Sequence, residues 1–580
     1  MKQARLINNI IGGSYEADER FAGCAVSQNL FAESVEEASN GFYYTTALRS
    51  VDGERIVLQD FIYKDTYSQG CRGLFSASNE CIYGAFGDCV YRLERNDNTG
   101  KYEATLLYTE AVPTIGEIVF CETGGINSHV CWVNGTEVVR AYPIEAEKAM
   151  QSGFVPPLSF HTPLRQYKTA DEVKNDTNEH IAPNQICSIN GSLVINDPKS
   201  DTWYYTDAYI LGGTSYKREI YALNEDGSVQ YESGSTYKVK TREVRLTDFD
   251  PASTTSYLWL DRYSKPNFQT AEYSADNVTG MCVAGDRLVV FGTKSIQSYA
   301  QTTSTDAQGF SYMVFSSMNS NVRDIGCKAI NSIKVVGQGA VFLCNSSTGE
   351  KSVMVAGNGQ PSRISTNAIE REIEAVNTDD AYAFTYSGKG HQFYGITIPA
   401  LDKTYVYDFA TRQWHNRSTF DGKGRNGAWW CRYVASAKAD VILCGKGISK
   451  VAVFDHNKYD DYLGNAIIKQ RTAPALTNDY SPFVLNDFHL LWNNGTTKDV
   501  TNENGALNPV VMLEVSEDGG NTFAMERWAY GGRAGQYGYR TIFYGLGGYG
   551  NLFVFRITIS DRVNVVITGA KVGHTATNGF

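Results

Sequence analysis

The sequence predicts an all-β protein: a β-propeller with an N-terminal arm before it and an antiparallel β-domain after it. Three observations support this fold class. Short apolar runs with period-two alternation recur along the chain, turn residues separate them, and long helical patterns are rare. Among 580 residues, 54 are Gly and 37 are Tyr, and glycine-rich turns joined to aromatic strands are typical of all-β folds.

Residues 1–60 do not follow the strand-and-turn rhythm, and we interpret them as an N-terminal arm. A polar leading segment of this kind either frays or is held by a neighbouring surface. The residues alone favour neither alternative.

From 61 to 476 the chain repeats groups of up to four short apolar strands with turn signals between them. One group contains ECIYGAF, DCVYRLER and KYEATLLYT, and a later one contains YAFTYS, HQFYGITI and KTYVYDFATRQWHNRS. Strands grouped in this way predict a β-propeller of roughly six or seven blades. A single β-sandwich is the competing interpretation, but the region is long for one.

Two segments interrupt the propeller rhythm. The excursion at about 209–250 contains the charged strand YKVKTREVRLTDFD. Insertions on a rigid scaffold often carry contacts, although a decorated surface loop is the more common outcome. The second segment predicts a short helix, because Asn367 and Glu370 have capping-box spacing and Ile369 and Ile373 share one helical face.

The final region, 477–580, is predicted to be an antiparallel, sandwich-like β-domain. Three runs alternate with period two, which places one set of side chains inward and the other toward water. The residues predicted to point inward are Val511, Leu513, Val515, Phe553, Phe555, Ile557, Ile559, Val563, Val565 and Ile567; Val554 is among those predicted to point outward.

The segment SEDGGNTF in this domain is interpreted as a structural turn formed by Ser516, Asp518, Gly520 and Thr522. An Asp side chain can bond the backbone two residues on, and Gly tolerates positive φ. The pattern also resembles the Asp-box hairpin of sialidase propellers, but those enzymes repeat it and add an Arg triad and an R-I-P segment, which we do not find.

Charge and cysteine usage restrict the classes of function. The formal net charge is -11 and no long basic run is present, which argues against strong sequence-independent DNA binding. The 12 cysteines are scattered singly without a CxxC pair, so we expect them to be reduced and mostly buried. Neither a signal peptide nor an apolar run of transmembrane length is predicted.

No catalytic, cofactor-binding or metal site is predicted, and we do not expect an enzyme. Two G-x-G-x-x-G matches, Gly422–Gly427 and Gly545–Gly550, precede strand patterns rather than the helix that a dinucleotide site needs. Cys121, His129 and Cys131 lack zinc-site spacing and are expected to be buried strand residues.

The aromatic pair Trp429 and Trp430 could stack on sugars or bases, but such residues more often fill the interfaces between blades.

Both ends of the chain resemble tail nozzle or hub proteins of short-tailed phages, a family also called packaged-DNA stabilisation proteins. At the C-terminal end the resemblance rests on SEDGGNTF, RTIFYGLGGYG, FVFRI and VNVVITGA. At the N-terminal end, Gly12-Gly13-Ser14-Tyr15, Cys24 and QNLFAE are similar to the opening G-x-Y … C-x-N-L-Y-x-E pattern of the family. The middle of the chain is similar only in architecture.

The resemblance implies a structural virion protein of the tail, assembled in the host cytoplasm. Proteins of this family form a homohexameric ring below the head-to-tail adaptor, retain the packaged DNA and conduct it at infection without binding it specifically. The implied partners are further copies of the chain, the adaptor, and a tail fibre or a needle or plug protein, with no membrane anchor.

The resemblance also favours docking for the N-terminal arm, through Tyr15, Asn29, Leu30 and Phe31, which match the family pattern. Deleting residues 1–40 should then leave a soluble propeller and abolish assembly. Two alternatives stay open: a tail-borne glycan hydrolase, which needs converging carboxylates, and a glycan-binding receptor protein that uses surface Trp and Tyr.

Overall fold

The computed structural model describes most of the chain. The described residues are 2–7, 10–16, 24–36, 43–59, 70–110, 115–124, 128–144, 157–165, 179–206, 215–221, 230–233, 236–245, 267–271, 276–305, 311–318, 322–357, 360–478, 481–495 and 508–576.

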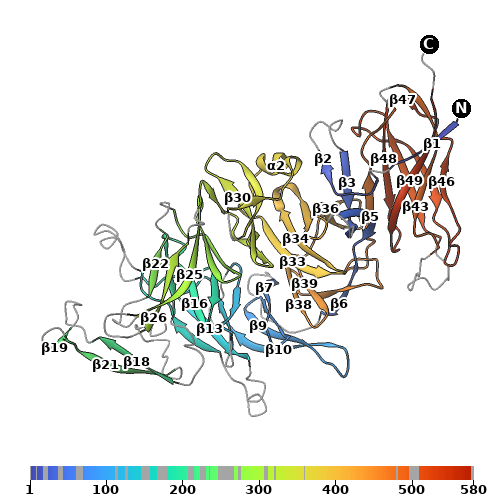
Figure 1. Ribbon diagram of the computed structural model, residues 1–580. Helices are drawn as coiled ribbons and strands as arrows, with labels where there is room; N and C mark the ends of the chain where they lie inside the picture. The colour runs from blue at the N-terminus through green and yellow to red at the C-terminus, as the bar shows by residue number, and fades with distance from the viewer. Residues whose placement is uncertain are drawn as a thin grey trace. The chain divides into compact units, whose positions relative to one another are not determined.

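The chain divides into two compact units. Unit 1 comprises Met1–Ile56, Ser365–Cys431 and Ala452–Phe580, and unit 2 comprises Val57–Ile364 and Arg432–Val451. Figure 1 shows that strands make up almost all of the described secondary structure. The predicted all-β fold class is confirmed.

Unit 2 is a series of antiparallel sheets in which strands that follow one another in sequence are mostly hydrogen-bonded neighbours. The first two sheets are β7 (Cys71–Ser76), β8 (Ile82–Phe86), β9 (Cys89–Arg95) and β10 (Tyr102–Thr109), and β11 (Val119–Glu122), β12 (His129–Val133), β13 (Val138–Pro143) and β14 (Leu158–His161). The third is β15 (Ile186–Ile189), β16 (Ser192–Asn196), β17 (Thr202–Tyr205) and β22 (Phe268–Thr270).

Two larger sheets and a hairpin follow in this unit. The fourth sheet is β23 (Gly280–Ala284), β24 (Arg287–Phe291), β25 (Ser295–Thr305), β26 (Ser311–Ser317) and β27 (Val322–Arg323). The fifth is β28 (Ile325–Gly326), β29 (Lys334–Val336), β30 (Gly339–Ser346), β31 (Lys351–Ala356) and β32 (Ser362–Arg363), with the 3₁₀ turn η7 (Ile330–Ser332). The hairpin is β38 (Tyr433–Ala437) with β39 (Asp440–Cys444).

Successive sheets of unit 2 pack face to face, because their inner strands bury both faces. In β12, Val130 and Trp132 join the cluster that contains β8, whereas Cys131 and Val133 join the cluster that contains β16. The same alternation recurs in β16 and β24. Packing of each sheet on the sheets before and after it is the arrangement of propeller blades. The number of blades stays a prediction.

The predicted excursion at about 209–250 falls between β17 and β22 of one sheet. Two strand pairs are described in it: β18 (Ser215–Tyr221) with β21 (Val239–Arg245), and β19 (Tyr231–Ser233) with β20 (Thr236–Tyr237). The excursion is therefore an insertion between β17 and β22, the third and fourth strands of the third sheet.

Unit 1 contains two large sheets. The seven-stranded sheet runs β4 (Leu30–Glu36), β5 (Tyr43–Ser50), β49 (Val566–Ala576), β43 (Phe483–Trp492) and β46 (Thr541–Tyr544), with β1 (Lys2–Leu6) on β49 and β47 (Tyr549–Gly550) on β43. A further pair is β6 (Gly53–Leu58) with β40 (Val451–Asp455).

The second sheet of unit 1 has twelve strands. Its main path is β33 (Tyr382–Gly388), β34 (His391–Ile398), β35 (Lys403–Asp408), β36 (Gln413–Phe420), β3 (Cys24–Gln28), β41 (Lys469–Thr472), β48 (Leu552–Ile559), β44 (Val510–Ser516) and β45 (Ala524–Tyr530). The side strands are β2 (Tyr15–Glu16) on β3, β37 (Asn426–Ala428) on β36 and β42 (Leu476–Thr477) on β48; the 3₁₀ turn η8 (Pro399–Leu401) precedes β35.

One hydrophobic core fills the C-terminal part of unit 1, and the N-terminal residues are part of it. Ile7, Ile10, Leu30, Ala32 and Leu48 pack in the same cluster as the apolar side chains of β43, β44 and β48. The segment predicted as an arm thus supplies strands and core side chains to the fold. The boundaries predicted near residues 60 and 476 stay a prediction.

The inward faces predicted for the C-terminal strands are confirmed, with two differences. All ten side chains predicted to be inward are buried. Val554 is also fully buried, so its predicted outward position is wrong; β48 is an interior strand of the twelve-stranded sheet and is covered on both faces there. Val563 and Val565 are buried but precede β49, which begins at Val566.

The predicted helix is confirmed as α2 (Asn367–Glu374), but its cap is one residue earlier than expected. Thr366 is the N-cap, and its side chain accepts a hydrogen bond from the backbone N–H of Ile369. Ser365 Oγ donates to Glu370 Oε1 at 2.5 Å. Ile369 and Ile373 are buried, as the helical period predicted.

Candidate assembly sites

Asn29 fixes the N-terminal segment between two parts of unit 1. Its φ of 54° is left-handed, a conformation in which Asn is several-fold enriched among non-glycine residues. Its Nδ2 donates to Ser418 Oγ and to the Ile468 carbonyl, both at 2.8 Å, and its Oδ1 accepts from the Ser418 backbone N–H at 2.9 Å. The side chain, 1% exposed, is therefore fully engaged within the chain.

The two apolar residues beside Asn29 are also buried within the chain. Leu30 packs in the core cluster, and the Phe31 ring lies edge-on to His391 and Phe393 at 5.1 and 5.5 Å between centroids. Of the four residues predicted to dock, Tyr15 is exposed, at 41%. The structure thus places Asn29, Leu30 and Phe31 in intramolecular contacts and leaves Tyr15 at the surface.

Arg471 on β41 holds the backbone on either side of β2. Its Nε donates to the Ile10 carbonyl at 2.7 Å, and its Nη1 donates to the carbonyls of Gly13 and Val26 at 3.1 and 3.4 Å. The guanidinium is 1% exposed, so these carbonyls replace water for a buried charge. β2 and β3 are thereby tied to the C-terminal strands.

Glu54 is a buried carboxylate with several donors around it. Trp429 Nε1 and Trp430 Nε1 donate to it at 2.9 and 2.6 Å, the Tyr462 backbone N–H donates at 3.2 Å, and Arg417 Nη2 lies at 3.4 Å. Burial raises the pKa of Glu54, and the charge of Arg417 opposes that shift. Arg417 also lies over the Trp429 ring at 3.9 Å.

The hydrogen bonds to Glu54 hold Trp429 and Trp430 within the fold. Trp429 is 2% exposed, and both indole N–H groups are used by Glu54, so the pair is an internal anchor rather than a stacking surface. Sequence reasoning missed Glu54. The sequence feature that could have indicated its burial is the spacing of two residues that places Glu54 on the same face of a strand as the apolar Ile56 and Leu58.

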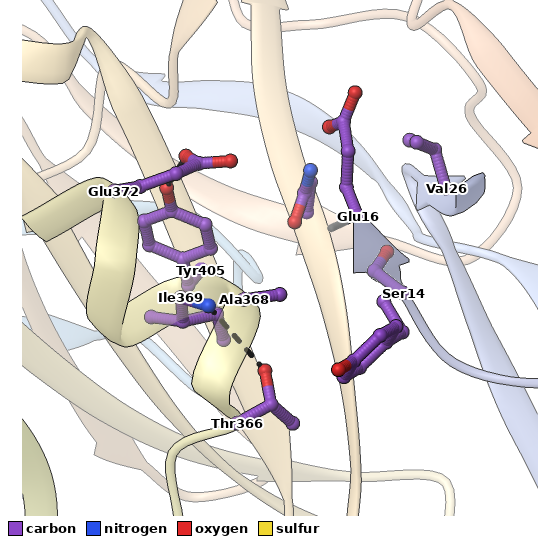
Figure 2. Close-up of a pocket in the computed structure, with 10 residues that line it drawn as sticks. Ser14, Glu16, Val26, Thr366, Ala368, Ile369, Glu372 and Tyr405 are labelled. Atoms are coloured by element: carbon purple, nitrogen blue, oxygen red, sulfur yellow. Dashed lines mark hydrogen bonds between the residues drawn. The ribbon is translucent and has the colours of Figure 1, made fainter. Parts of the chain in front are cut away.

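Figure 2 shows a small hollow between β2 and α2. Glu16 on β2 and Glu372 on α2 lie on opposite sides of it. Tyr405 Oη donates to Glu372, and Lys403 Nζ lies 2.7 Å from Glu372 Oε2. Burial, followed by the charges of Glu372 and Glu16, raises the pKa of Tyr405. The residues that line the hollow are Ser14, Tyr15, Glu16, Val26, Thr366, Ala368, Ile369, Glu372, Tyr405 and Asn416.

The predicted turn motif is built as a closed set of hydrogen bonds. Ser516 Oγ donates to Asp518 Oδ1 at 2.7 Å and accepts from the Gly520 N–H at 2.8 Å. Thr522 donates to Asp518 through its N–H at 2.9 Å and its Oγ1 at 2.6 Å, and these bonds lower the pKa of Asp518. Gly519 and Gly520 have φ of 76° and 96°. The motif shapes the link from β44 to β45.

The two G-x-G-x-x-G segments and the Cys and His residues considered as possible metal ligands lie in or next to β-strands. Gly422–Gly427 runs into the first residues of β37, and Gly545–Gly550 follows β46 and ends in β47, so each leads into a strand, as expected. Cys121, His129 and Cys131 are buried strand residues. In the described part of the chain, no group of three or more His, Cys, Asp or Glu side chains is arranged to hold a metal ion.

Two further expectations concern cysteines and membrane spans. Eleven cysteines are described, all free, and ten of them are buried. Among the described helices, none is both long and apolar enough to cross a bilayer.

Comparison with known proteins assigns both domains. Residues 220–434 match the family model of the bacteriophage P22 Gp10 β-propeller, and residues 469–575 match that of the P22 Gp10 β-sandwich. The chain is 24% identical over 217 residues to the tail hub protein gp10 of Salmonella phage P22, a match that spans 36% of this chain and 42% of that protein.

Solved structures give a weaker similarity. A streptogramin B lyase matches at a TM-score of 0.33 with 10% identity, over 74% of this chain and 98% of that one. Apo AztD from Citrobacter koseri matches at a TM-score of 0.29 with 10% identity, over 74% and 91%. Neither bears on function. The two family matches and the curated relative show that the chain belongs to the phage tail hub, or nozzle, family.

Proposed function

We propose that this chain forms the ring of the tail hub below the head-to-tail adaptor, that the ring retains packaged DNA, and that its channel conducts the genome at infection. The observation that carries the proposal is the pair of family matches, which assign a P22 Gp10 β-propeller to residues 220–434 and a P22 Gp10 β-sandwich to residues 469–575. We propose no catalytic activity.

The way unit 1 is built suits a load-bearing ring. The N-terminal strand β3 lies between β36 and β41, and buried Asn29 and Arg471 bind it to both sides through hydrogen bonds. A ring that holds pressurised DNA needs subunits whose strands, such as β3 between β36 and β41, do not separate under load. The net charge of -11 favours a channel that repels the duplex rather than binding it.

The proposed partners are further copies of the chain, forming a homohexamer, the adaptor, and a tail fibre or a needle or plug protein; assembly takes place in the host cytoplasm. Ring closure requires heterologous contacts between different surfaces of neighbouring copies. We place one docking contact at the exposed Tyr15.

The retention function can be tested with particles that lack this chain. Heads packaged in its absence should fill with DNA and then lose it, and adding the purified chain to such heads should restore retention, measured as nuclease-resistant DNA per portal. In the same assay, the chain with Arg471→Ala, whose N-terminal anchorage is weakened, should restore retention less well than the wild type. Heads that keep their DNA without the chain would refute the retention function.

A further inference from the structure

An exposed group of aromatic and arginine side chains lies on β45 and in the loop that follows it. We call it the aromatic-arginine patch; its members are Trp528, Tyr530, Arg533, Tyr537, Tyr539 and Arg540. Trp528, Tyr530 and Tyr537 are 59%, 56% and 74% exposed, and both arginines are exposed. β45 is the end strand of the twelve-stranded sheet, with β44 as its neighbour on the path.

The patch is held in shape by the backbone. Gly535 N–H donates to the Gly495 carbonyl at 2.9 Å, Gln536 N–H donates to the Arg533 carbonyl at 2.9 Å, and Tyr539 N–H donates to the Gln536 carbonyl at 3.0 Å. On β45, Met525 and Ala529 pack against the core, which turns Trp528 and Tyr530 outward. A pre-shaped surface loses little conformational entropy when a partner binds.

The composition of the patch favours a protein as its partner. Tyr, Trp and Arg are the residues enriched in the energetic centres of protein interfaces. Contiguous exposed apolar surface on an end strand of a sheet commonly marks an interaction site.

Charge complementarity identifies a second copy of this chain as the occupant. The chain carries a net charge of -11, whereas the patch carries Arg533 and Arg540. The hollow of Figure 2 carries the carboxylate of Glu16, and the exposed Tyr15 lies at it; the second carboxylate there, Glu372, is paired with Lys403.

The patch and the hollow lie in different places along one sheet. β2, which carries Glu16, pairs with β3, and β3 is separated from β45 by β41, β48 and β44. With strands about 4.8 Å apart, β3 and β45 are roughly 20 Å from each other. Two different, complementary surfaces on one chain are what a head-to-tail contact requires.

We infer that the aromatic-arginine patch of one copy docks against the hollow of the next copy, with Arg533 and Arg540 facing Glu16, and Tyr537 covering the hollow beside Tyr15. This inference rests on the ring of the proposed function and names the contact that builds it.

A charge-swap experiment tests the contact. The patch variant is R533E/R540E, the hollow variant is Glu16→Arg, and the control is K101E/K328E, which reverses the same number of exposed positive charges outside both surfaces. Circular dichroism and the melting temperature establish folding. Native mass spectrometry and light scattering of the full chain measure self-association.

Each single-surface variant should weaken self-association by about tenfold or more, because it places like charges opposite each other. The control should associate like the wild type. A mixture of the patch and hollow variants should regain assembly, since each supplies a surface that fits the other. Tyr537→Ser should weaken association without any change of charge.

The remaining outcomes contradict the contact in distinct ways. If the wild type self-associates and the variants do so equally well, the contact is wrong and the ring survives with another interface. If the variants associate normally but lose binding to an oligonucleotide or to host lipopolysaccharide, the patch serves that ligand instead. A wild type that stays monomeric at every concentration contradicts both this contact and self-assembly of the ring.

Discussion

Asn29 and Ser418 exchange two hydrogen bonds across 389 residues of sequence: Asn29 Nδ2 donates to Ser418 Oγ at 2.8 Å, and the Ser418 N–H donates to Asn29 Oδ1 at 2.9 Å. Ser418 lies on β36, the last strand of the β33–β36 meander. A third bond, from Asn29 to Ile468, reaches the residue before β41. One side chain thus joins the N-terminal segment to β36 and to the residue before β41, two strands of the same twelve-stranded sheet.

Replacing Asn29 should lower the stability of unit 1. Asn29→Ala removes all three side-chain hydrogen bonds. It also leaves Ala at a φ of 54°, a left-handed conformation that Ala tolerates less well than Asn. We therefore expect the free energy of unfolding to fall by about 2–4 kcal/mol. Asn29→Gly keeps the left-handed backbone at little cost and should lose about 1 kcal/mol less. Urea unfolding measures both; equal losses would show that backbone strain contributes nothing.

Glu54→Ala should be among the most damaging single changes in unit 1. It leaves the indole N–H groups of Trp429 and Trp430 and the Arg417 guanidinium without their shared acceptor in a buried site. Removing one partner of a buried charged group costs about 3–5 kcal/mol. Glu54→Gln keeps one carbonyl acceptor and should cost less.

The readout is the unfolding midpoint together with tryptophan fluorescence, because the indoles lose their acceptor. A Glu54→Ala protein that is as stable as Glu54→Gln would contradict the assigned role of the carboxylate.

His415 should make stability depend on pH. It is 2% exposed, and burial lowers its pKa to about 3 despite the opposing charge of Asp408; Arg417 and His391 add to the lowering. Between about pH 6.5 and 3 the unfolded chain binds a proton at this site that the folded chain does not. Stability should therefore fall as the pH falls through this window, by up to about 1.4 kcal/mol per pH unit.

His415→Phe removes the titrating group and keeps an aromatic ring beside Phe31 and Phe393. The slope of unfolding free energy against pH from 6.5 to 4 should be smaller in this variant than in the wild type. Identical slopes would show that His415 is not the group that titrates.

Deleting residues 1–40 should damage folding as well as assembly. The deletion removes β1, β3 and β4, which pair with β49, β41 and β5, and takes Leu30 and Ala32 out of the core. It also removes the carbonyls that Arg471 binds. We expect unit 1 to bind a hydrophobic dye and to be cut rapidly by protease; a deleted chain that melts like the wild type would refute this.

The strand pattern of this chain could be predicted because period-two alternation is local. Val511, Leu513 and Val515 point inward as predicted, and α2 lies where its helical period placed it. The turn at Asp518 was predictable for the same reason, since all its hydrogen bonds lie within seven residues.

The pairing of distant segments could not be predicted. A strand such as β3 carries no local sign of which edges it will join, and its partners lie about four hundred residues away at β36 and β41. Tyr15, Asn29, Leu30 and Phe31 were expected to act together at an interface; three of them are buried within the chain, because the segment completes the sheets of unit 1.

The location of this chain in the virion tests the account most directly. Antibody-labelled intact virions can be imaged by electron microscopy, and copies counted by quantitative mass spectrometry against the portal. An axial position under the adaptor, in a copy number set by six-fold symmetry, is the predicted result. A peripheral position on the tail, or absence from the virion, would contradict the tail hub assignment and direct attention to glycan binding or cleavage.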